Sequence, residues 1–398
     1  MTNARWASSV SDAADIGDAV AQTVGDIRRQ LGGDEPDLVI AFASPHHEAH
    51  FPAIPDFVQP ELGGQFFGCT GGGVIGGGRE VESRPGFSLS AAVLPRVRVL
   101  PFHLTDRDLA ELGAHADRWA KRLGVSADED PQFVLLPDPF SCDVERLLSM
   151  LDQLYPCSPK IGGLASGART AGGNALWADG RIHSEGVVGL ALVGDLVIDT
   201  LVAQGCRPVG EPMFVTRCHD NRIYELDGRP PLDVLRDLYE RCDEDDRLLM
   251  QHSLFLGLVM APLRENYRRG DFLIRNIFGI DAESGALAIG AAVHDNEVVQ
   301  FHLRDVITSA EDLSELLGRY RLDHDGAEPV GSLLFSCLGR GKGFYGHADH
   351  DTDAFRAFLG QVPLGGFFCN GEIGAVHGTT FLHGYTSSFG LFRQKARP

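Results

Sequence analysis

Polar and charged side chains follow an apolar run near the end of the chain, and their types suit the binding of a small anion. The run ends at Ser336 and Cys337 and opens onto a glycine-rich loop that contains Gly339, Arg340 and Gly341. Backbone N–H groups in such a loop, beside a guanidinium, can hold a carboxylate or a phosphate. The loop lacks the Lys-Ser/Thr ending of a P-loop. The alternative interpretation is that its glycines only allow positive φ angles.

A second polar set, Asn370, Gly371 and Glu372, follows another apolar run. If the two loops lie at neighbouring strand ends, Glu372 and Arg340 approach the same cleft. A carboxylate and a guanidinium held apart there would complement the ammonium and the carboxylate of an amino acid. The alternative is that Glu372 and Arg340 pair with each other as a structural ion pair.

Arg275 and Asn276 interrupt the apolar run 272–280. A guanidinium in a buried strand is costly to desolvate unless it meets an anion or carbonyl groups, which favours ligand binding or domain bridging. The alternative is an exposed face of the strand, because side chains alternate. The predicted ligand-binding residues are therefore Arg275, Asn276, Ser336, Cys337, Gly339, Arg340, Gly341, Asn370, Gly371 and Glu372.

Histidines gather in two places, which raises the possibility of a metal site. His46, His47 and His50 lie close together, as do His347 and His350, but no spacing matches a zinc signature. We therefore expect no metal and no cofactor. The segment 347–351 is more simply a polar loop that leads into a helix capped at residue 351.

Nucleophilic catalysis is the alternative chemistry. Cys337 or Cys369 would be the nucleophile, with His383 as the base and Glu372 orienting it. Cysteines in buried strands usually behave as small unreactive hydrophobes. A cysteine-dependent hydrolase is therefore the alternative hypothesis, and the sequence leaves enzymatic activity uncertain, with a non-enzyme favoured.

These residues sit in a pattern that occurs three times. Each copy has an apolar strand, a polar loop, a helix, a Gly-Gly-apolar turn and then a hairpin or pair of strands. The first strands are expected at 38–43, 133–136 and 332–337, and the glycine turns within 63–69, 160–167 and 362–374. Before the first copy, apolar residues recurring at helical spacing predict an amphipathic helix over 5–31.

The predicted fold class is α/β (α+β), with mixed sheets flanked by helices and two domains built from the repeated strand-loop-helix-hairpin units. A different block begins near 230 with two prolines that open a helix. We place the domain boundary in the segment 205–228, which divides the chain into domains 1–215 and 216–398.

Composition and charge exclude several classes of protein. The 398 residues carry a formal net charge of -20, which disfavours nucleic acid and anionic membranes as partners. The longest apolar stretch, 186–205, contains Asp195 and Asp199 and does not suit a membrane span. Acidic residues near the start argue against a signal peptide. Eight cysteines without CxxC pairs indicate reduced thiols in the cytoplasm.

Separated motifs along the chain resemble the FIST family (F-box and intracellular signal transduction proteins). The C-terminal motifs are Gly270–Ile277, Gln300–Asp305, Phe335–Gly341 and Gly366–Gly374, and the N-terminal part is similar over Ala41–His47 and Gly68–Gly76. The resemblance implies a FIST-N-like domain over 1–215 and a FIST-C-like domain over 216–398. It also implies an intracellular sensor of a small ligand, with amino acids as a proposed ligand class.

The resemblance and the residues together predict a cytoplasmic, ligand-binding sensory protein whose partner is a small molecule such as an amino acid. No methyl-accepting, kinase or cyclase module and no F-box is evident before the last residue, Pro398. We therefore expect a separate signalling protein as the output partner. The alternatives are the cysteine-dependent hydrolase and a protein-interaction scaffold.

Overall fold

The chain folds into two compact units that are interleaved along the sequence. The computed structural model describes residues 3–261, 266–281, 283–324 and 326–395. The three-sheet unit comprises Met1–Val202, Leu316–Leu382 and Thr386–Pro398, and the barrel unit comprises Ala203–Glu315 and His383–Tyr385. These compact units are not the same division as the domains 1–215 and 216–398, which remain a prediction from the sequence.

The three-sheet unit contains three copies of one folding unit, in the order predicted from the sequence. The first copy consists of β2 (Leu38–Ala43), η1 (Pro45–Ala53), α2 (Ile54–Leu62), β3 (Gln65–Thr70), β4 (Gly73–Gly76), β5 (Arg79–Glu82) and β6 (Phe87–Val93). The second consists of β8 (Gln132–Pro137), α5 (Val144–Leu154), β9 (Lys160–Gly163), β10 (Leu176–Ala178), β11 (Arg181–His183) and β12 (Val187–Gly194). The third consists of β20 (Gly331–Cys337), α9 (Lys342–Tyr345), α10 (His350–Leu359), β21 (Leu364–Cys369), β22 (Glu372–Val376), β23 (Thr379–His383) and β24 (Ser387–Gln394).

Each copy pairs its strands in the same way. The first strand is parallel to the second in all three copies (β2 with β3, β8 with β9, β20 with β21). The last strand is antiparallel to the first (β6 with β2, β12 with β8, β24 with β20). The mixed α+β architecture predicted from the sequence is confirmed, with helices against sheets that contain both parallel and antiparallel pairs.

The short hairpin of each copy pairs with a strand in the sheet of another copy. Hairpin β4–β5 of the first copy pairs with β21 of the third, β10–β11 of the second pairs with β3 of the first, and β22–β23 of the third pairs with β9 of the second. The strands at the opposite edges of the sheets are β1 (Arg5–Ser11), β7 (Val97–Leu104) and β13 (Leu196–Ala203). Three six-stranded sheets result, in the orders β1-β6-β2-β3-β10-β11, β23-β22-β9-β8-β12-β7 and β13-β24-β20-β21-β4-β5.

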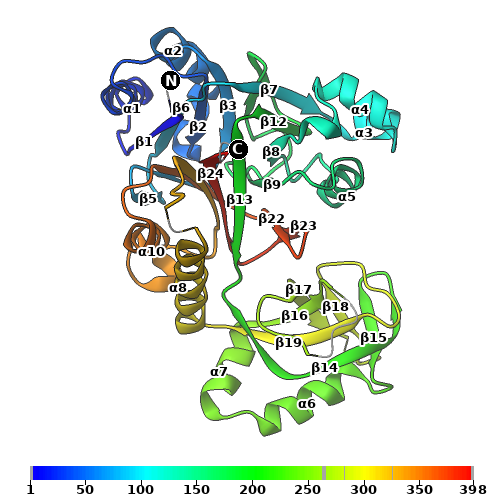
Figure 1. Ribbon diagram of the computed structural model, residues 1–398. Helices are drawn as coiled ribbons and strands as arrows, with labels where there is room; N and C mark the ends of the chain where they lie inside the picture. Colours follow the sequence, from blue (N-terminus) through cyan, green and yellow to red (C-terminus); the bar gives the residue numbers. More distant parts are fainter. Residues whose placement is uncertain (1–2, 262–265, 282, 325, 396–398) are drawn as a thin grey trace. The chain divides into compact units, whose positions relative to one another are not determined.

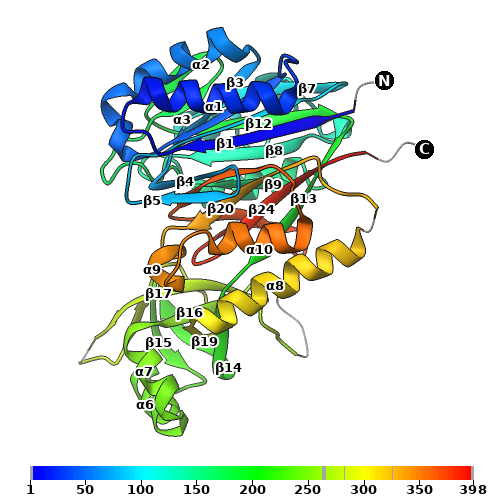
Figure 2. The same ribbon diagram turned by 90° about the vertical axis from the view of Figure 1, so that its left-hand side faces the viewer.

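The inner faces of the three sheets share one apolar core, and helices cover the outer faces (Figures 1 and 2). Phe367 of the third sheet contacts Phe42 of the first, with ring centroids 4.7 Å apart, and lies 5.7 Å from Phe335 of the neighbouring strand. Helices α1 (Ile16–Leu31) and α2 pack on the sheet of the first copy. Helices α3 (Asp106–Leu112), α4 (Ala116–Leu123) and α5 pack on the second, near the short η2 (Ala127–Glu129). Helix α10 packs on the third through its Phe355, whose ring stacks on Phe389 at 5.7 Å.

The opening segment differs from the helix expected over 5–31. Its first part, Arg5–Ser11, is strand β1, and the helix begins only at Ile16 after the N-cap Asp15. Residues 5–11 pair in continuous register with β6. Ladder hydrogen bonds and burial in the sheet therefore outweigh the local pattern. Gly32, at φ 66°, ends α1 in the left-handed conformation.

One glycine of each second strand is required by the closeness of the parallel pair. Gly68, Gly162 and Gly366 have φ of 154°, 157° and 150°. A Cβ at these positions would lie 1.9, 1.8 and 1.9 Å from a carbonyl oxygen of the first strand of the same copy, at Ala41, Leu135 and Leu334. Real Cβ atoms do not approach backbone oxygen so closely. The three copies therefore share a steric constraint as well as an element order.

The barrel unit is built differently from the repeated copies. Its strands close in the order β14 (Cys206–His219), β15 (Arg222–Leu226), β18 (Leu287–Ile289), β17 (Phe272–Ile280), β16 (Leu254–Val259) and β19 (Val298–Arg304). Helix α6 (Pro231–Arg241) begins at the expected proline pair, and α7 (Glu244–His252) follows it. Their apolar faces pack against a core that includes Val215, Leu256 and Phe301. Helix α8 (Val306–Asp323) has residues in both units.

Among the residues that the structure describes, no helix has both the length and the apolar character needed to cross a bilayer.

We predict that Gly366→Ala strongly destabilises the three-sheet unit. The added Cβ would collide with the carbonyl oxygen of Leu334 at a backbone angle that alanine tolerates poorly, so the loss is expected to be about 3 kcal/mol or more. The control is Gly343→Ala in α9, where a Cβ would meet no atom within 4 Å. Chemical denaturation of both variants measures the difference, and equal stability would contradict the steric requirement.

Candidate functional site

The residues predicted from the third copy lie together at the ends of β20 and β21. Ser336 and Cys337 end β20, Glu372 begins β22, and Asn370 and Gly371 form the turn before it. Because β20 and β21 are parallel and in register, with Cys337 opposite Cys369, the two loops leave the sheet at the same edge. Figure 2 shows α9 and α10 following β20 on this side of the three-sheet unit.

Arg340 is buried and forms an ion pair with another residue of the protein. Its side chain is 1% exposed and makes a bidentate pair with Asp351, with Nε–Oδ2 at 3.0 Å and Nη2–Oδ1 at 2.9 Å. The hydroxyls of Ser336 and Ser387 donate to the same Oδ2, at 3.0 and 2.5 Å. Burial alone raises the pKa of Asp351, but Arg340 and these hydrogen bonds hold it well below its usual range.

Asp351 is the ion-pair partner of Arg340, so the role that we expected for it from the sequence is wrong. We expected Asp351 to cap the following helix, whereas Asp349 is the N-cap of α10 and Asp351 lies buried in its first turn. A carboxylate is needed there because a buried guanidinium without one is expensive. Breaking such a pair typically costs about 3–5 kcal/mol.

The glycine-rich loop does hold a carboxylate, and that carboxylate belongs to the protein. Glu82, from hairpin β4–β5 of the first copy, accepts a hydrogen bond from the backbone N–H of Lys342 at 2.9 Å. Gly341 has φ 74°, and a Cβ on it would lie 2.4 Å from a Glu82 oxygen. Gly341 therefore allows the hairpin to approach the loop.

Glu372 is buried and has its own hydrogen-bond partners. Its Oε2 accepts from the backbone N–H and the hydroxyl of Thr386, at 3.0 and 2.7 Å, and its Oε1 accepts from the thiol of Cys369 at 3.5 Å. Burial raises the pKa of Glu372 to about 7, against the opposing effect of the Thr386 hydrogen bonds. The strand ends thus contain a carboxyl group that titrates near neutrality.

A second buried carboxyl group at this place belongs to a residue 272 positions before its partner Thr352, and the sequence pattern did not reveal it. Glu80 of β5 is 3% exposed, and its Oε1 accepts from the backbone N–H of Thr352 at 2.9 Å. Its backbone N–H donates to Asp349 at 2.6 Å, and its Oε2 has no hydrogen-bond partner among the described residues. Burial, then the nearby charge of Asp351, raises the pKa of Glu80 to about 8.

Arg275 and Asn276 belong to the barrel unit, whereas the other predicted site residues belong to the three-sheet unit. Both lie in β17, opposite Leu256 and Phe255 of β16. Asn276 accepts a hydrogen bond from the hydroxyl of Tyr385. Arg275 is half-buried and donates to the carbonyl oxygen of Ile274 at 3.2 Å.

The histidine groups do not form a recognisable metal site in the described part of the chain. No group of three or more His, Cys, Asp or Glu side chains is placed there to hold a metal ion. His47 is fully buried, and burial lowers its pKa. His350 stacks on Tyr345 with ring centroids 3.5 Å apart and contacts Asp351 at 3.2 Å.

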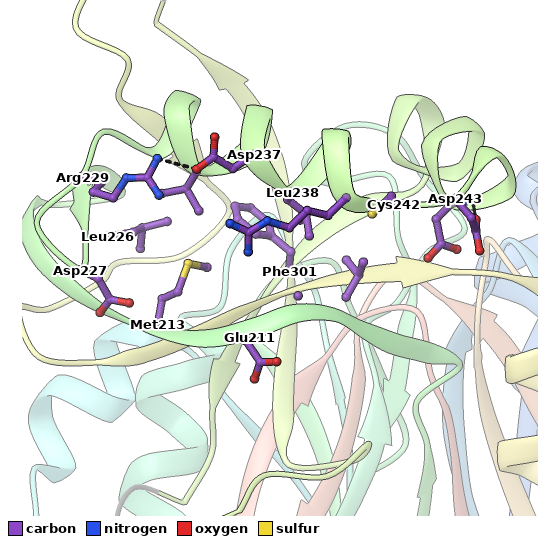
Figure 3. Close-up of a pocket in the computed structure, with 15 residues that line it drawn as sticks. Glu211, Met213, Leu226, Asp227, Arg229, Asp237, Leu238, Cys242, Asp243 and Phe301 are labelled. Atoms are coloured by element: carbon purple, nitrogen blue, oxygen red, sulfur yellow. Dashed lines mark hydrogen bonds and ion pairs between the residues drawn. The ribbon is translucent and has the colours of Figure 1, made fainter.

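The barrel unit contains a pocket of about 600 Å³ that the sequence did not reveal. It lies between α6 and the strands β14 and β19 (Figure 3). Apolar side chains form its floor, namely Val209, Met213, Leu226, Val234, Leu238 and Phe301. Charged side chains surround them, namely Glu211, Asp227, Arg229, Asp237, Arg241, Asp243 and Asp246. The sequence predicted only the helix after the proline pair, which forms one side of this pocket.

Ion pairs and capping hydrogen bonds hold part of the charged rim. Arg229 pairs with Asp237 at 2.7 Å across the start of α6 (Figure 3). Asp243 is the N-cap of α7 and accepts from the backbone N–H of Asp246 at 2.8 Å. Arg207, outside the pocket lining, bridges Asp246 and Asp305. The rim is thus organised without closing the pocket.

Comparison with known proteins gives the family. The FIST N domain model matches residues 37–229, and the FIST C domain model matches residues 231–375. The chain belongs to the FIST family. The resemblance inferred from the sequence motifs is therefore confirmed, and with it the presence of domains that are associated with signal transduction.

Two mycobacterial relatives are similar to this FIST protein over nearly its whole length, and an F-box protein is similar over a quarter of it. An uncharacterized protein of Mycobacterium tuberculosis is 35% identical over 387 residues, which is 96% of this chain and 98% of the relative. An uncharacterized protein of Mycobacterium bovis is 33% identical over 384 residues, 95% of this chain and 96% of the relative. The human F-box only protein 22 is 31% identical over 101 residues, 25% of each chain.

We predict that Glu80 makes this FIST protein less stable as the pH rises. The carboxyl group ionises near pH 4.5 in the unfolded chain and near pH 8 in the folded one. The folded state therefore binds the extra proton between these values, and stability falls with a slope of up to about 1.4 kcal/mol per pH unit. Above about pH 8 the contribution is constant.

The variant Glu80→Gln removes this titration and keeps an acceptor for the Thr352 N–H. Denaturation from pH 5 to pH 9 should show the variant gaining stability relative to wild type as the pH rises. Glu48→Gln, at an exposed position, is the control and should follow wild type. A Glu80→Gln profile parallel to wild type would contradict the buried, protonated state.

We predict that Cys369 reacts slowly with iodoacetamide. The thiol is buried, and burial, followed by the charge of Glu372, raises its pKa far above the usual value. The exposed Cys157 is the internal control and should be labelled first. Mass spectrometry of the labelled peptides gives both rates. Faster labelling at Cys369 would favour the cysteine-hydrolase alternative.

Proposed function

We propose that this FIST protein is a cytoplasmic sensory protein that binds a small organic molecule reversibly in the pocket of the barrel unit. The observation that carries the proposal is the pocket itself. Its volume of about 600 Å³ lies within the range of about 300–1,000 Å³ that is usual for small-molecule sites. Its apolar floor and charged rim suit a ligand with an apolar body and a charged group.

The state of the strand ends favours the pocket over the site predicted from the sequence. Arg340 is paired with Asp351, the glycine-rich loop holds Glu82, and Glu372 is bonded to Thr386. A ligand there would have to displace buried hydrogen bonds, and each unsatisfied group would cost about 1–3 kcal/mol. Ligand binding by the ten residues predicted from the sequence stays a prediction.

Amino acids remain within the proposed ligand class, because the rim has both carboxylates and guanidinium groups. The output would pass to a separate signalling protein. Binding that orders α6 and α7 over the barrel offers a physical route, since both helices line the pocket and both pack on the barrel core.

The test is a thermal-shift screen of the full chain with amino acids, amines and small acids, followed by titration calorimetry of the hits. A ligand at 100 times its Kd should stabilise the folded barrel unit by about 2.7 kcal/mol. Leu238→Trp, which fills the pocket from α6, should abolish binding. Asn370→Ala, at the exposed turn of the strand-end site, should leave it unchanged. Binding that survives Leu238→Trp but is lost in Asn370→Ala would move the site to the strand ends, and a screen without hits would overturn the proposal.

A further inference from the structure

We propose that the ligand of the barrel-unit pocket is an organic cation with an apolar body, such as an arylalkylamine. This inference rests on the proposed function and names the ligand class for the same pocket. It follows from the imbalance of charge around an apolar floor.

The lining of the pocket has an excess of carboxylates. Its five acidic residues are Glu211, Asp227, Asp237, Asp243 and Asp246, and its two basic residues are Arg229 and Arg241. The ion pair Arg229–Asp237 is neutral, and Arg207 offsets Asp246 from outside the lining. Three carboxylates then stand against the single guanidinium of Arg241. A cation entering the pocket gains from this field, whereas an anion is repelled.

Two of these three carboxylates lie at the ends of the pocket. Figure 3 shows the carboxylates of Asp227 and Asp243 at opposite ends, with Met213, Leu238 and Phe301 between them. Asp227 is fixed by a hydrogen bond from the backbone N–H of Phe214 at 2.9 Å. Asp243 is fixed as the N-cap of α7. Both carboxylates are therefore held in place before a ligand arrives, which lowers the entropic cost of binding.

The carboxylates at one end of the pocket also act on a thiol in the lining. Cys242 is half-buried, and its pKa is raised by burial, then by Asp246 and Asp243. The guanidinium groups of Arg247 and Arg207 act in the opposite direction, with a smaller effect. The same field that disfavours a thiolate at this end of the pocket favours an ammonium group.

The apolar floor defines the rest of the ligand. Met213, Val234 and Leu238 are partly exposed and offer the apolar surface, whereas Phe301 and Leu226 are buried. An alkyl or aryl body on this floor would remove apolar surface from water, while the ammonium group remains near the carboxylate rim. Inorganic cations do not use such a floor, which is why the structure assigns an amphipathic organic cation.

The first experiment compares three probes with one skeleton, namely 4-phenylbutylamine, 4-phenylbutanol and 4-phenylbutyrate, by calorimetry on the full chain. We expect the amine to bind at least about ten-fold more tightly than the carboxylate, a difference of about 1.4 kcal/mol, with the alcohol between them. The difference should shrink at high salt because the rim is exposed to solvent. A carboxylate that binds as tightly as the amine would overturn the inference.

Matched variants separate charge from shape. Asp227→Asn and Asp243→Asn keep the size of the side chain, and asparagine also serves as an N-cap at 243. The double variant should weaken the amine several-fold and leave the alcohol unchanged. Leu238→Trp should weaken all three probes. Equal losses for amine and alcohol in the asparagine variant would also count against the inference.

A measurement on Cys242 keeps the charge inference distinct from the proposed function. The rates of modification by cationic and anionic methanethiosulfonates are compared at Cys242, with Cys157 as the reference. We expect a preference for the cationic reagent that falls in Asp243→Asn. Equal rates for the cationic and anionic reagents at Cys242 would overturn the charge inference, whichever ligand is found to bind. A clear preference with no binding of any probe or library compound would overturn the proposed function, and the ligand class with it.

Discussion

The hydrogen bonds between each sheet and the hairpin of another copy hold the three-sheet unit together. Hairpin β4–β5 completes the sheet of the third copy, β10–β11 that of the first, and β22–β23 that of the second. Each copy therefore needs a hairpin of another copy to pair the free side of its second strand, and loss of one hairpin would expose that strand as the sheet edge. The shared apolar core also holds the three copies together, because the inner faces of all three sheets contribute to it.

Three carboxyl groups and a guanidinium meet where one of these hairpins docks. Glu80 and Glu82 come from β5, and they meet the backbone of the loop and helix that follow β20. The pair Arg340–Asp351 lies in the same loop and helix. Buried ionic groups add little net stability, but they penalise any other arrangement of the chain. The residue types that suggested a ligand site thus help to specify which hairpin is accepted.

The order of elements within each repeat could be predicted from the sequence. The pairing of each hairpin with the sheet of another repeat could not. Strand, loop, helix and glycine turn recur locally, so 38–43, 133–136 and 332–337 were placed correctly from periodicity. The edge that a hairpin joins depends on contacts hundreds of residues away, and nothing within Arg79–Glu82 specifies β21 as the neighbour. The strand Arg5–Ser11 was missed for a related reason, since its ladder with β6 overrides a helical pattern.

The sequence predicted which polar residues gather at the strand ends, but it did not predict which partners they bind. Proximity of the loops after β20 and β21 followed from parallel strands, and the structure brings Ser336, Arg340 and Glu372 to one edge. The partners of Arg340 and Gly341 are Asp351 and Glu82, and only tertiary packing supplies the second of them. The pocket in the barrel unit arises where a helix crosses two strands, a geometry that has no signature in a single stretch of sequence.

The exchange also has a consequence for how the nascent polypeptide matures. Hairpin β4–β5 leaves the ribosome long before its neighbour β21, and most of the barrel unit, Ala203–Glu315, is synthesised between them. At about 5–20 residues per second, the wait for roughly 280 residues lasts on the order of 15–60 s. During that time the early strands have an uncompleted edge, so the emerging chain depends on chaperones or on rapid local collapse to avoid aggregation.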